Sequence, residues 1–506
     1  MTEKDFWKLQ NGNDIRGIAV EGIEGENVNL TPEAVNRIAS GFVKFLSEKL
    51  NQPAQNLKIA IGHDSRVSAP KLLKSACESL IASGVEVLNC GLASTPAMFM
   101  SIVFDETKAD GSIMLTASHL PFNRNGLKFF TRDGGLEKSD ITIVLKNAID
   151  SEIAKGDIDS AKKFDLISIY AEHLKNIILK NLNLAPDSKP FAGMKIIVDA
   201  GNGSGGFFAS KILEPLGADI SGSQFLEPNG LFPNHIPNPE DEEAMASVKK
   251  AVLENHADLG LIFDTDVDRG GAVLSDGKEI ARNALVAMMA AILAPDYPKS
   301  TIVTDSVTSD ELHVFLEKNL GLKHHRFKRG YKNVINECIR LNKSGEISPL
   351  AIETSGHGAL SENYFLDDGA YLAVKILIAA AKLHRENKNL SDLIAALKYP
   401  AESKEFRLKI VGQEDAGEYG ERVLKTFIER AEKSGIKQAS PNFEGVRLIF
   451  DNGWASLRAS LHEPKLQFNI ESREIGGCKK IIAVLKNFFK DFDSVDLTLI
   501  DQYLEQ

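Results

Sequence analysis

Three segments of the chain share one pattern that strongly limits the possible fold. Each is a continuous apolar run that ends in polar or glycine residues and leads into a helical stretch: LKIAIGHDSR (57–66), MKIIVDAGNGSG (194–205) and STIVTDSVTSDEL (300–312). Runs of Ile and Val without alternating polar residues are typical of strands covered on both faces, as in parallel sheets. Such sheets bind ligands at the carboxyl ends of their strands, where these polar residues stand. The pattern therefore predicts three α/β domains in tandem.

The last hundred residues follow a different pattern. Residues 414–435 have helical spacing, short strands are expected around VRLIF (446–450) and LQFNI (466–470), and KKIIAVLKNFFKDF (479–492) has the spacing of an amphipathic helix. These elements predict a smaller α+β domain. A chain of 506 residues exceeds one hydrophobic core, because single domains usually have about 100–200 residues. The predicted domains are 1–163, 164–283, 284–400 and 401–506.

The composition argues against several classes of function. Lys and Arg total 59 against 70 Asp and Glu, a net charge of −11, so the chain lacks the basic character of nucleic-acid binders. The longest apolar run, 284–294, is shorter than the about 18 residues of a spanning helix, and the first residues carry acids where a signal peptide has bases. The four cysteines form no C-x-x-C pair, so neither a disulfide framework nor a zinc site is suggested. We expect a soluble cytoplasmic protein, a monomer or homodimer, that binds neither nucleic acid nor membrane.

Acidic residues alternate directly after an apolar run in LGLIFDTDVDRGG (259–271). If the chain stays extended there, Asp264, Asp266 and Asp268 point to one side. Three carboxylates so close together repel one another unless a hard divalent cation neutralises them. A calcium loop would need Gly and Glu where Arg269 and Ser275 stand, and an acidic exposed turn is the other alternative. The segment therefore predicts a magnesium site.

A serine stands between an apolar run and a loop rich in Pro, Asn and Gly in TASHLPFNRNGLKFF (116–130). Ser118 is expected to project from a turn, with His119 beside it and Lys128 ten residues on. A serine hydroxyl is a weak nucleophile until a base or a cation assists it, and His or Lys can do so. Taken alone, the segment is also compatible with a loop that only ends a strand.

Two further loops carry polar side chains suited to a sugar phosphate. In AIETSGHGALSENYFLDDGAY (351–371), Glu353, Ser355 and His357 alternate around a glycine and offer partners for neighbouring hydroxyl groups. A compact cluster of donors that suits a phosphate follows in SLRASLHEPKL (456–466): Arg458, Ser460, His462 and Lys465. Either loop, taken alone, is equally compatible with an ordinary exposed loop. Together with the serine and the aspartates, these loops are the parts of a phosphoryl-transfer enzyme that acts on a sugar phosphate.

These motifs, in this order, resemble the α-D-phosphohexomutase superfamily, which includes phosphoglucomutase, phosphomannomutase and phosphoglucosamine mutase. The resemblance runs the full length of the chain and is carried by NDIRG (13–17), GHDSR (62–66), the TASH loop, DAGNG (199–203), NGLFPNHIPNPEDE (229–242), DTDVDRGG (264–271), ETSGHG (353–358) and RASLHEPKL (458–466). It implies three related tandem α/β domains with mixed sheets and a smaller C-terminal α+β domain around a central cleft.

The resemblance also implies an activity. It is that of a magnesium-dependent isomerase, an intramolecular phosphotransferase that interconverts hexose 1-phosphate and hexose 6-phosphate of glucose or mannose. The reaction would pass through a phosphoserine enzyme and a hexose 1,6-bisphosphate, which would also serve as activator.

By the same resemblance, the motif residues receive roles. Ser118 carries the phosphoryl group, and the metal is held by the serine phosphate with Asp264, Asp266 and Asp268. The groups around the reacting phosphoryl are Arg16, Lys128 and Arg269, with Lys128 and His119 as candidates for proton transfer. The residues assigned to substrate binding are Glu353, Ser355, His357, Gly330, Tyr331, Arg458, Ser460 and His462.

Two alternative functions stay open. One is phosphoglucosamine mutase, which the ETSGHG loop does not exclude. The other is a hexose-bisphosphate synthase, or a degenerate member that only binds sugar phosphate, because Leu120 and Leu461 stand where the family usually has Asn and Gly. An intact Ser118 with three aspartates argues against a pure binding protein.

Overall fold

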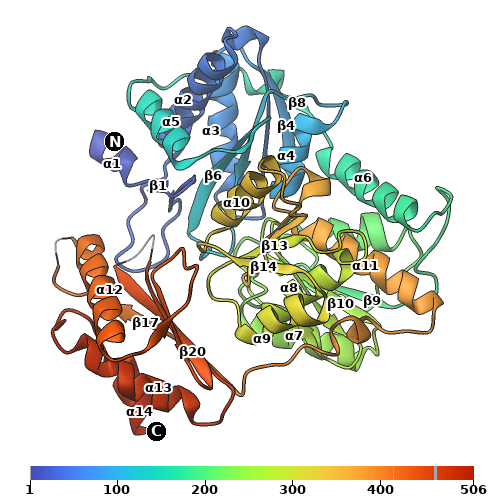
Figure 1. Cartoon of the computed structure of the whole chain (residues 1–506). Coiled ribbons are helices and arrows are strands. Elements are labelled where there is room, and N and C mark those ends of the chain that lie inside the picture. Colours follow the sequence, from blue (N-terminus) through green and yellow to red (C-terminus); the bar gives the residue numbers. More distant parts are fainter. Residues whose placement is uncertain (1, 414, 461–463) are drawn as a thin grey trace. The chain divides into compact units, whose positions relative to one another are not determined.

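The computed structural model describes residues 2–413, 415–460 and 464–506, and the chain divides into two compact units (Figure 1). The first unit is Met1–Ile292 with Ser355–Leu393, and the second is Leu293–Thr354 with Ile394–Gln506. Helices and strands carry the labels of Figure 1.

A mixed sheet forms the N-terminal part of the first unit. Its strand order is β1-β2-β6-β5-β3-β4-β8, with β7 paired to β6. Strand β3 has two parallel neighbours, β4 and β5, whereas β6 pairs antiparallel with β2 and β5. The strands are β1 (Gln10–Asn11), β2 (Asp14–Ile18), β3 (Lys58–His63), β4 (Glu86–Leu92), β5 (Gly111–Leu115), β6 (Arg124–Thr131), β7 (Gly134–Gly135) and β8 (Lys162–Lys163).

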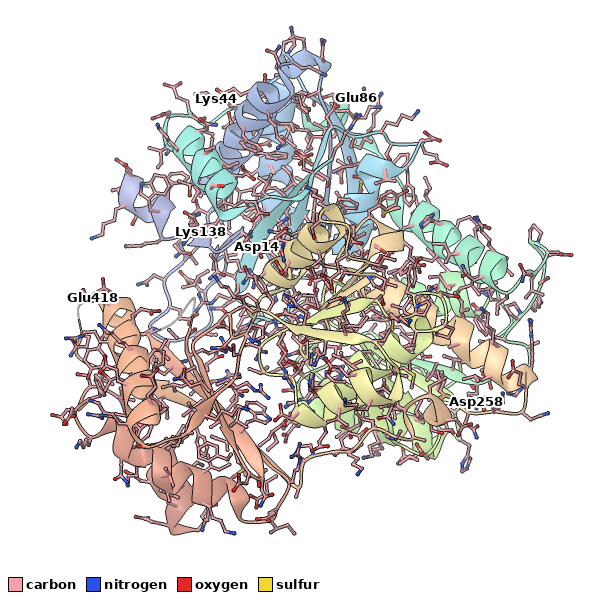
Figure 2. The ribbon with its side chains drawn as sticks, viewed as in Figure 1. Asp14, Lys44, Glu86, Lys138, Asp258 and Glu418 are labelled. Carbon is pink, nitrogen blue, oxygen red and sulfur yellow. The ribbon has the colours of Figure 1, made fainter. Side chains whose placement is uncertain are left out.

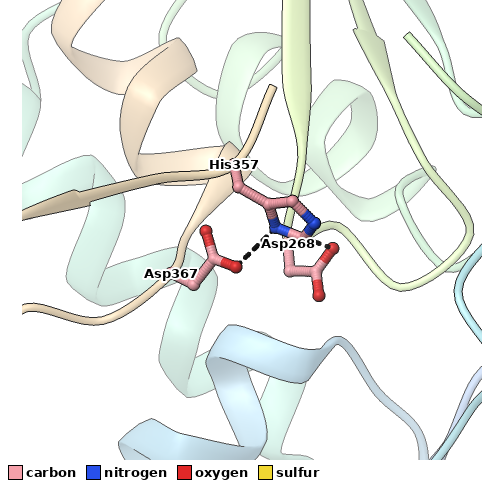
Figure 3. Close-up of side chains that lie close together, drawn as sticks. All are labelled: Asp268, His357 and Asp367. Atoms are coloured by element: carbon pink, nitrogen blue, oxygen red, sulfur yellow. Dashed lines mark hydrogen bonds and ion pairs between the residues drawn. The ribbon is translucent and has the colours of Figure 1, made fainter. Parts of the chain in front are cut away.

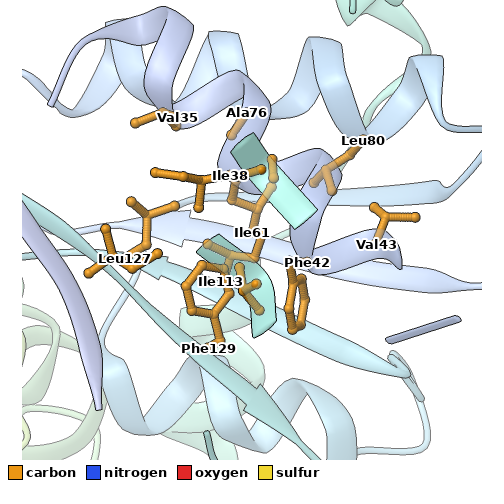
Figure 4. Close-up of a cluster of buried hydrophobic side chains, with 14 of the residues drawn as sticks. Val35, Ile38, Phe42, Val43, Ile61, Ala76, Leu80, Ile113, Leu127 and Phe129 are labelled. Carbon is orange, nitrogen blue, oxygen red and sulfur yellow. The ribbon is translucent and has the colours of Figure 1, made fainter. Parts of the chain in front are cut away.

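Helices cover both faces of this sheet, which is why nearly all residues of its central strands β3, β5 and β6 are buried. Ile59 and Ile61 of β3 belong to the core beneath the helices of one face, and Figure 4 shows that cluster. Gly62 points the other way, where an added Cβ would lie 2.7 Å from the sulfur of Met98 in α4. The helices of this part are α1 (Glu3–Trp7), α2 (Pro32–Leu50), α3 (Ala69–Ala82), α4 (Thr95–Val103), α5 (Lys138–Ile149) and α6 (Leu166–Asn181).

Local sequence sets both ends of the long helix α2. The Thr31 side chain accepts a hydrogen bond from the Ala34 N–H, and Pro32 occupies the first turn, where its missing N–H has no cost. Asn51 ends the helix with a φ of 52°, the left-handed conformation that Asn tolerates better than most residues.

A second sheet in the same unit has the order β12-β11-β10-β9, with β9 and β10 parallel and the other pairs antiparallel. Val248 and Val252 of α7 pack with Ile197 and Ile262 on one of its faces, and Phe208 packs against Phe263, with ring centroids 5.1 Å apart. The elements of this part are β9 (Ile196–Asp199), α7 (Glu242–Glu254), β10 (Leu259–Phe263), β11 (Gly270–Leu274), β12 (Glu279–Ile280), α8 (Asn283–Leu293) and α11 (Gly369–Arg385). Strand β16 (Gly358–Leu360) also belongs to the first unit but is not a strand of this sheet.

The second unit begins with parallel strands, because β13 pairs parallel with both β14 and β15. Helix α10 contacts β13 and β15. The elements are β13 (Thr301–Thr304), α9 (Asp310–Val314), β14 (Lys323–Arg326), α10 (Tyr331–Lys343) and β15 (Leu350–Ile352).

The C-terminal part of the second unit is an antiparallel sheet in the order β17-β21-β20-β19-β18, with α12 and α13 packed on it. The two strands expected from sequence are β19 and β21, and the charged segment ESKEFRLK adds the edge strand β17. The elements are β17 (Glu402–Lys409), α12 (Ala416–Lys433), β18 (Lys437–Gln438), β19 (Val446–Phe450), β20 (Gly453–Ala459), β21 (Lys465–Ser472), α13 (Gly477–Lys486) and α14 (Thr498–Glu505).

Tandem α/β sheets followed by a smaller α+β domain confirm the predicted fold class. The four domain ranges stay predictions. Charged side chains such as Lys44, Glu86, Asp258 and Glu418 are exposed (Figure 2). Among the described helices, none has the length and apolar character needed to cross a membrane.

Candidate active site

The structure places Ser118 in the turn after β5, in contact with a carboxylate and a guanidinium group. Ser118 is 1% exposed, and its φ of 51° is unusual for a residue with a side chain. Its hydroxyl donates to Asp264 Oδ2 at 2.9 Å, and Arg269 Nη2 donates to Ser118 Oγ at 2.9 Å. The serine oxygen therefore lies between a guanidinium group, which attracts phosphoryl oxygens, and a carboxylate.

The three aspartates converge in the turn between β10 and β11. The chain is not extended there, since residues 265–268 form a turn and Val267 has a φ of 67°. The predicted convergence is nevertheless present, because a carboxylate oxygen from each of Asp264, Asp266 and Asp268 lies within 4.8 Å of the others. The turn, rather than the two-residue repeat of a strand, brings the three carboxylates together.

The donor set of this cluster fits a divalent cation. Asp266 Oδ1 and Asp268 Oδ1 are buried and accept no hydrogen bond from any residue that the structure describes. Burial raises the pKa of Asp264 well above its usual range, and the neighbouring Asp268 and Asp266 raise it further. Carboxylate oxygens that accept no hydrogen bond have lone pairs available to coordinate Mg²⁺.

Lys128 of β6 brings a positive charge to the three carboxylates. Its ammonium group lies 2.9 Å from Asp266 Oδ2 and also contacts Asp268. Although burial opposes the charged form, Lys128, His357 and Arg269 lower the pKa of Asp268. Lys128 was predicted to flank the serine, and the structure brings it to the carboxylates.

His119 contacts the serine, and the charge of Arg16 acts on His119. Arg16 stands on β2 opposite Gly126 of β6, and its Nη2 lies 2.9 Å from Asp14 Oδ2. His119 Nδ1 lies 3.4 Å from Ser118 Oγ and 2.5 Å from Arg269 Nη2. The Arg269 charge and burial lower the pKa of His119 to about 2, so this imidazole is neutral and accepts a hydrogen bond from the guanidinium.

His357 contacts Asp268 of the cluster and a further aspartate, Asp367 (Figure 3). Its Nδ1 lies 2.5 Å from Asp367 Oδ2 and 3.8 Å from Asp268 Oδ1. Burial opposes its protonation, but Asp367 and Asp268 raise the pKa of His357 above its usual value. The loop comes this close because the carbonyl of Gly356, a residue with a φ of 95°, accepts a hydrogen bond from the Gly270 N–H.

Other polar residues of the site were not found from sequence. Thr95 donates its hydroxyl to Asp266 Oδ2 at 2.5 Å, and Asn238 Oδ1 accepts from Arg269 Nη1 at 3.3 Å. Glu240 Oε2 lies 3.9 Å from Arg269 Nη1. The quoted motif NGLFPNHIPNPEDE contains Asn238 and Glu240, but neither received a role from it. Thr95 follows β4 without a motif of its own.

The second unit holds other predicted residues. Glu353 follows β15, and its Oε1 accepts from the Gly330 N–H at 2.6 Å, directly before Tyr331 begins α10. Ser355 and His357, which share a motif with Glu353, belong to the first unit.

The predicted phosphate loop also lies in the second unit. Arg458 is 6% exposed and stands in β20, with its Nη1 3.8 Å from Glu444 Oε1. Burial lowers its pKa, and its buried Nε donates to no residue within the described part of the chain. The Ser460 N–H donates to the Lys465 carbonyl at 2.9 Å. His462 lies outside the described residues.

Three family models match consecutive segments that together cover most of the chain. They describe the α/β/α domains I, II and III of phosphoglucomutase/phosphomannomutase and match residues 8–155, 168–277 and 281–399. Similar proteins include a phosphomannomutase/phosphoglucomutase of Pseudomonas aeruginosa, 28% identical over 86% of this chain and 88% of that protein. A phosphoglucomutase of Neisseria gonorrhoeae is 29% identical over 90% of this chain and 91% of its own length.

Solved structures agree on the fold. A phosphoglucomutase/phosphomannomutase family protein from Burkholderia thailandensis aligns with a TM-score of 0.78 and 23% identity, over 97% of this chain and 98% of its own. A Paramecium phosphoglucomutase, parafusin, aligns with a TM-score of 0.72 and 18% identity, over 96% and 95% of the two chains. Motifs, domain matches and fold agree, and the chain belongs to the phosphoglucomutase/phosphomannomutase family.

Proposed function

We propose that this protein is a phosphohexomutase that interconverts the 1- and 6-phosphates of glucose and of mannose. The single observation that carries the proposal is the contact of Ser118 Oγ with both Asp264 and Arg269, at 2.9 Å each. This arrangement offers a hydroxyl that carries a phosphoryl group beside carboxylates for a metal and a guanidinium for the phosphoryl oxygens.

The proposed reaction begins with Ser118 phosphorylated. The free hydroxyl of a hexose monophosphate attacks the phosphorus, the bond from phosphorus to Ser118 Oγ breaks, and the hydroxyl proton passes to a base of the site. The product is a hexose 1,6-bisphosphate. After the sugar has turned over, the other phosphoryl group returns to Ser118 and the isomeric monophosphate leaves.

The chain's own residues provide most of the groups that this cycle needs. Arg269 binds oxygens of the transferring phosphoryl group, and His119 and Lys128 are the proposed proton carriers. Asp264, Asp266 and Asp268 would hold Mg²⁺, which supplies neutralisation of the charge on the phosphoryl group when it is bound. We propose hexose 1,6-bisphosphate as activator, because an unphosphorylated Ser118 has to be loaded before the first turnover.

Substrate recognition is proposed for the residues of the later motifs. Carboxylate and hydroxyl groups at Glu353 and Ser355 would pair with hydroxyls of the ring. Arg458, with Ser460 and His462, would bind the phosphate that is not transferred, since a guanidinium offers two parallel donors to phosphate oxygens.

A coupled assay tests the proposal against its alternatives. Purified protein with Mg²⁺ receives glucose 1-phosphate, mannose 1-phosphate, glucosamine 1-phosphate or N-acetylglucosamine 1-phosphate, each with and without glucose 1,6-bisphosphate. We expect formation of the 6-phosphates of glucose and mannose, faster with the bisphosphate. Turnover of glucosamine 1-phosphate alone would support the phosphoglucosamine mutase, and binding without turnover would support the degenerate member.

A further inference from the structure

The motif GHDSR contributes an arginine that has no role in the proposed reaction. Arg66 follows β3 and is 1% exposed, yet a guanidinium is among the costliest groups to bury without partners. Its partners are main-chain carbonyls of the loop that carries Ser118. Nη1 donates to Pro121 O at 2.7 Å and to Arg124 O at 2.9 Å, and Nη2 donates to Ser118 O at 2.5 Å and to Leu120 O at 2.6 Å.

The same arginine belongs to a closed ring of contacts around the serine backbone. Arg66 Nε lies 3.3 Å from Asp64 Oδ2, which accepts the hydroxyl of Thr116 at 2.7 Å. Thr116 Oγ1 in turn accepts the N–H of Ser118 at 2.9 Å. Both the N–H and the carbonyl of Ser118 are therefore held by one network that begins and ends at Arg66.

This network explains how Ser118 keeps a strained conformation. A φ of 51° is unfavourable for a residue with a Cβ and persists only where the surrounding contacts enforce it. With the backbone held in this way, the hydroxyl reaches Asp264 and Arg269. The hydrogen bond from Arg66 to Ser118 goes to the main-chain carbonyl, so Arg66 acts on the serine through the main chain.

A segment of the second α/β region covers the network. The ring of Phe232 lies 5.3 Å from the Arg66 guanidinium carbon. At Gly230, an added Cβ would lie 2.4 Å from both Ser65 O and Val67 N, so only glycine lets the NGLF segment approach the turn of Arg66. This gives a physical reason for part of the NGLFPNH motif.

We infer that Arg66, together with Asp64 and Thr116, is a positioning residue that sets Ser118 for phosphoryl transfer. The inference rests on the proposed function. A lysine would not replace the arginine, because one ammonium group has three donors at a single point, whereas the guanidinium fork reaches four carbonyls that diverge from it.

The test compares two conservative substitutions. Arg66→Lys is expected to lower kcat for glucose 1-phosphate at least 100-fold while KM changes less than threefold, and to slow loading of Ser118 by glucose 1,6-bisphosphate to a similar degree. Arg37→Lys is the matched control, since Arg37 also donates to main-chain carbonyls, those of Ala148 and Ile149, but away from the serine loop. It is expected to lower the melting temperature without changing kcat more than threefold.

A second pair of variants guards against misfolding of Arg66→Lys. Thr116→Val breaks the ring without a change of charge or size and is expected to lower kcat at least tenfold, and Thr116→Ser, which keeps the hydroxyl, is expected to recover most of that loss. If kcat of Arg66→Lys stays within threefold of wild type, or if kcat in all four variants simply follows melting temperature, the inference is wrong.

Amide hydrogen exchange separates this inference from the proposed function. Residues 116–124 are expected to exchange faster in Arg66→Lys and in Thr116→Val than in wild type or Arg37→Lys. Should wild type turn over no hexose phosphate, the proposed function fails while this exchange result still reports on positioning. Unchanged exchange in both variants overturns the positioning role, whatever the activity.

Discussion

At the scale of single residues, the sequence identified side chains whose neighbours along the chain already form a pattern. Ser118 in TASH and the aspartates of DTDVDR are examples, because each motif holds several of the required groups within a few residues. Thr95 and Asp367 were missed: Asp266 lies 171 residues after Thr95, and Asp367, although it stands in the quoted segment 351–371, is 10 residues from its partner His357. Such contacts depend on which strand ends meet, which periodicity does not determine.

A substitution in the aspartate cluster tests the metal site. Asp266→Asn removes one of three charges that attract a hard cation, so we expect at least tenfold weaker Mg²⁺ binding, measured by titration calorimetry and as the Mg²⁺ concentration for half-maximal activity. Asp296→Asn, an exposed aspartate outside the site, is the control. Equal Mg²⁺ affinity in Asp266→Asn and wild type would refute the proposed ligand set.

At the scale of elements, the apolar runs predicted strands and their parallel pairing correctly. Residues 57–66, 194–205 and 300–312 contain β3, β9 and β13, and each of these strands has a parallel neighbour. Two features could not be predicted in the same way. The turn at Val267 interrupts the expected extended segment. In the charged edge strand β17 the apolar alternation is limited to Phe406 and Leu408, because residues 403–405 are all exposed.

The loop that carries Asn238 and Glu240 is joined to β9 by a histidine, which predicts a dependence of stability on pH. His235 Nε2 lies 3.1 Å from both oxygens of Asp199, and although burial opposes protonation, Asp199 raises the pKa of His235. Because the pKa of His235 is higher in the folded than in the unfolded protein, its protonation stabilises the folded state. This stabilisation is complete below the unfolded pKa of about 6.5 and is lost as pH rises through the folded pKa.

We therefore expect the melting temperature of wild type to fall between pH 6.5 and 9 by more than that of His235→Gln. The comparison is made by calorimetry in buffers of equal ionic strength, and the difference between the two proteins isolates the contribution of His235. Parallel curves for the two proteins would show that this ion pair does not contribute.

At the scale of the whole molecule, the tandem order of the domains was predictable from the repeated pattern, and the family matches agree with it. The predicted site residues are divided between the two compact units: Ser118 and the aspartates belong to the first, and Glu353 and Arg458 belong to the second. Periodicity assigns residues to strands and loops within one domain, and it carries no information about contacts between domains.

The proposed roles of the site residues predict the relative kcat/KM of the enzyme for glucose and mannose phosphates. Glucose and mannose phosphates differ only at carbon 2, and no residue of the quoted motifs is assigned to that carbon. We expect comparable kcat/KM for both, and we expect Glu353→Ala to lower both by a similar factor, because the ring hydroxyls lose a partner. Glu317→Ala serves as the control. A preference of about a thousandfold, roughly 4 kcal/mol, would reveal a contact specific to carbon 2.

The central claim is that Ser118 carries the phosphoryl group, and intact-mass spectrometry tests it most directly. After incubation with glucose 1,6-bisphosphate and Mg²⁺, wild type and Ser112→Ala should gain roughly 80 Da, the mass of one phosphoryl group, and should lose it when glucose 1-phosphate is added in excess. Ser118→Ala should gain nothing and should not turn over hexose phosphates. An adduct of that mass on Ser118→Ala, or wild-type turnover without any adduct, would contradict the account.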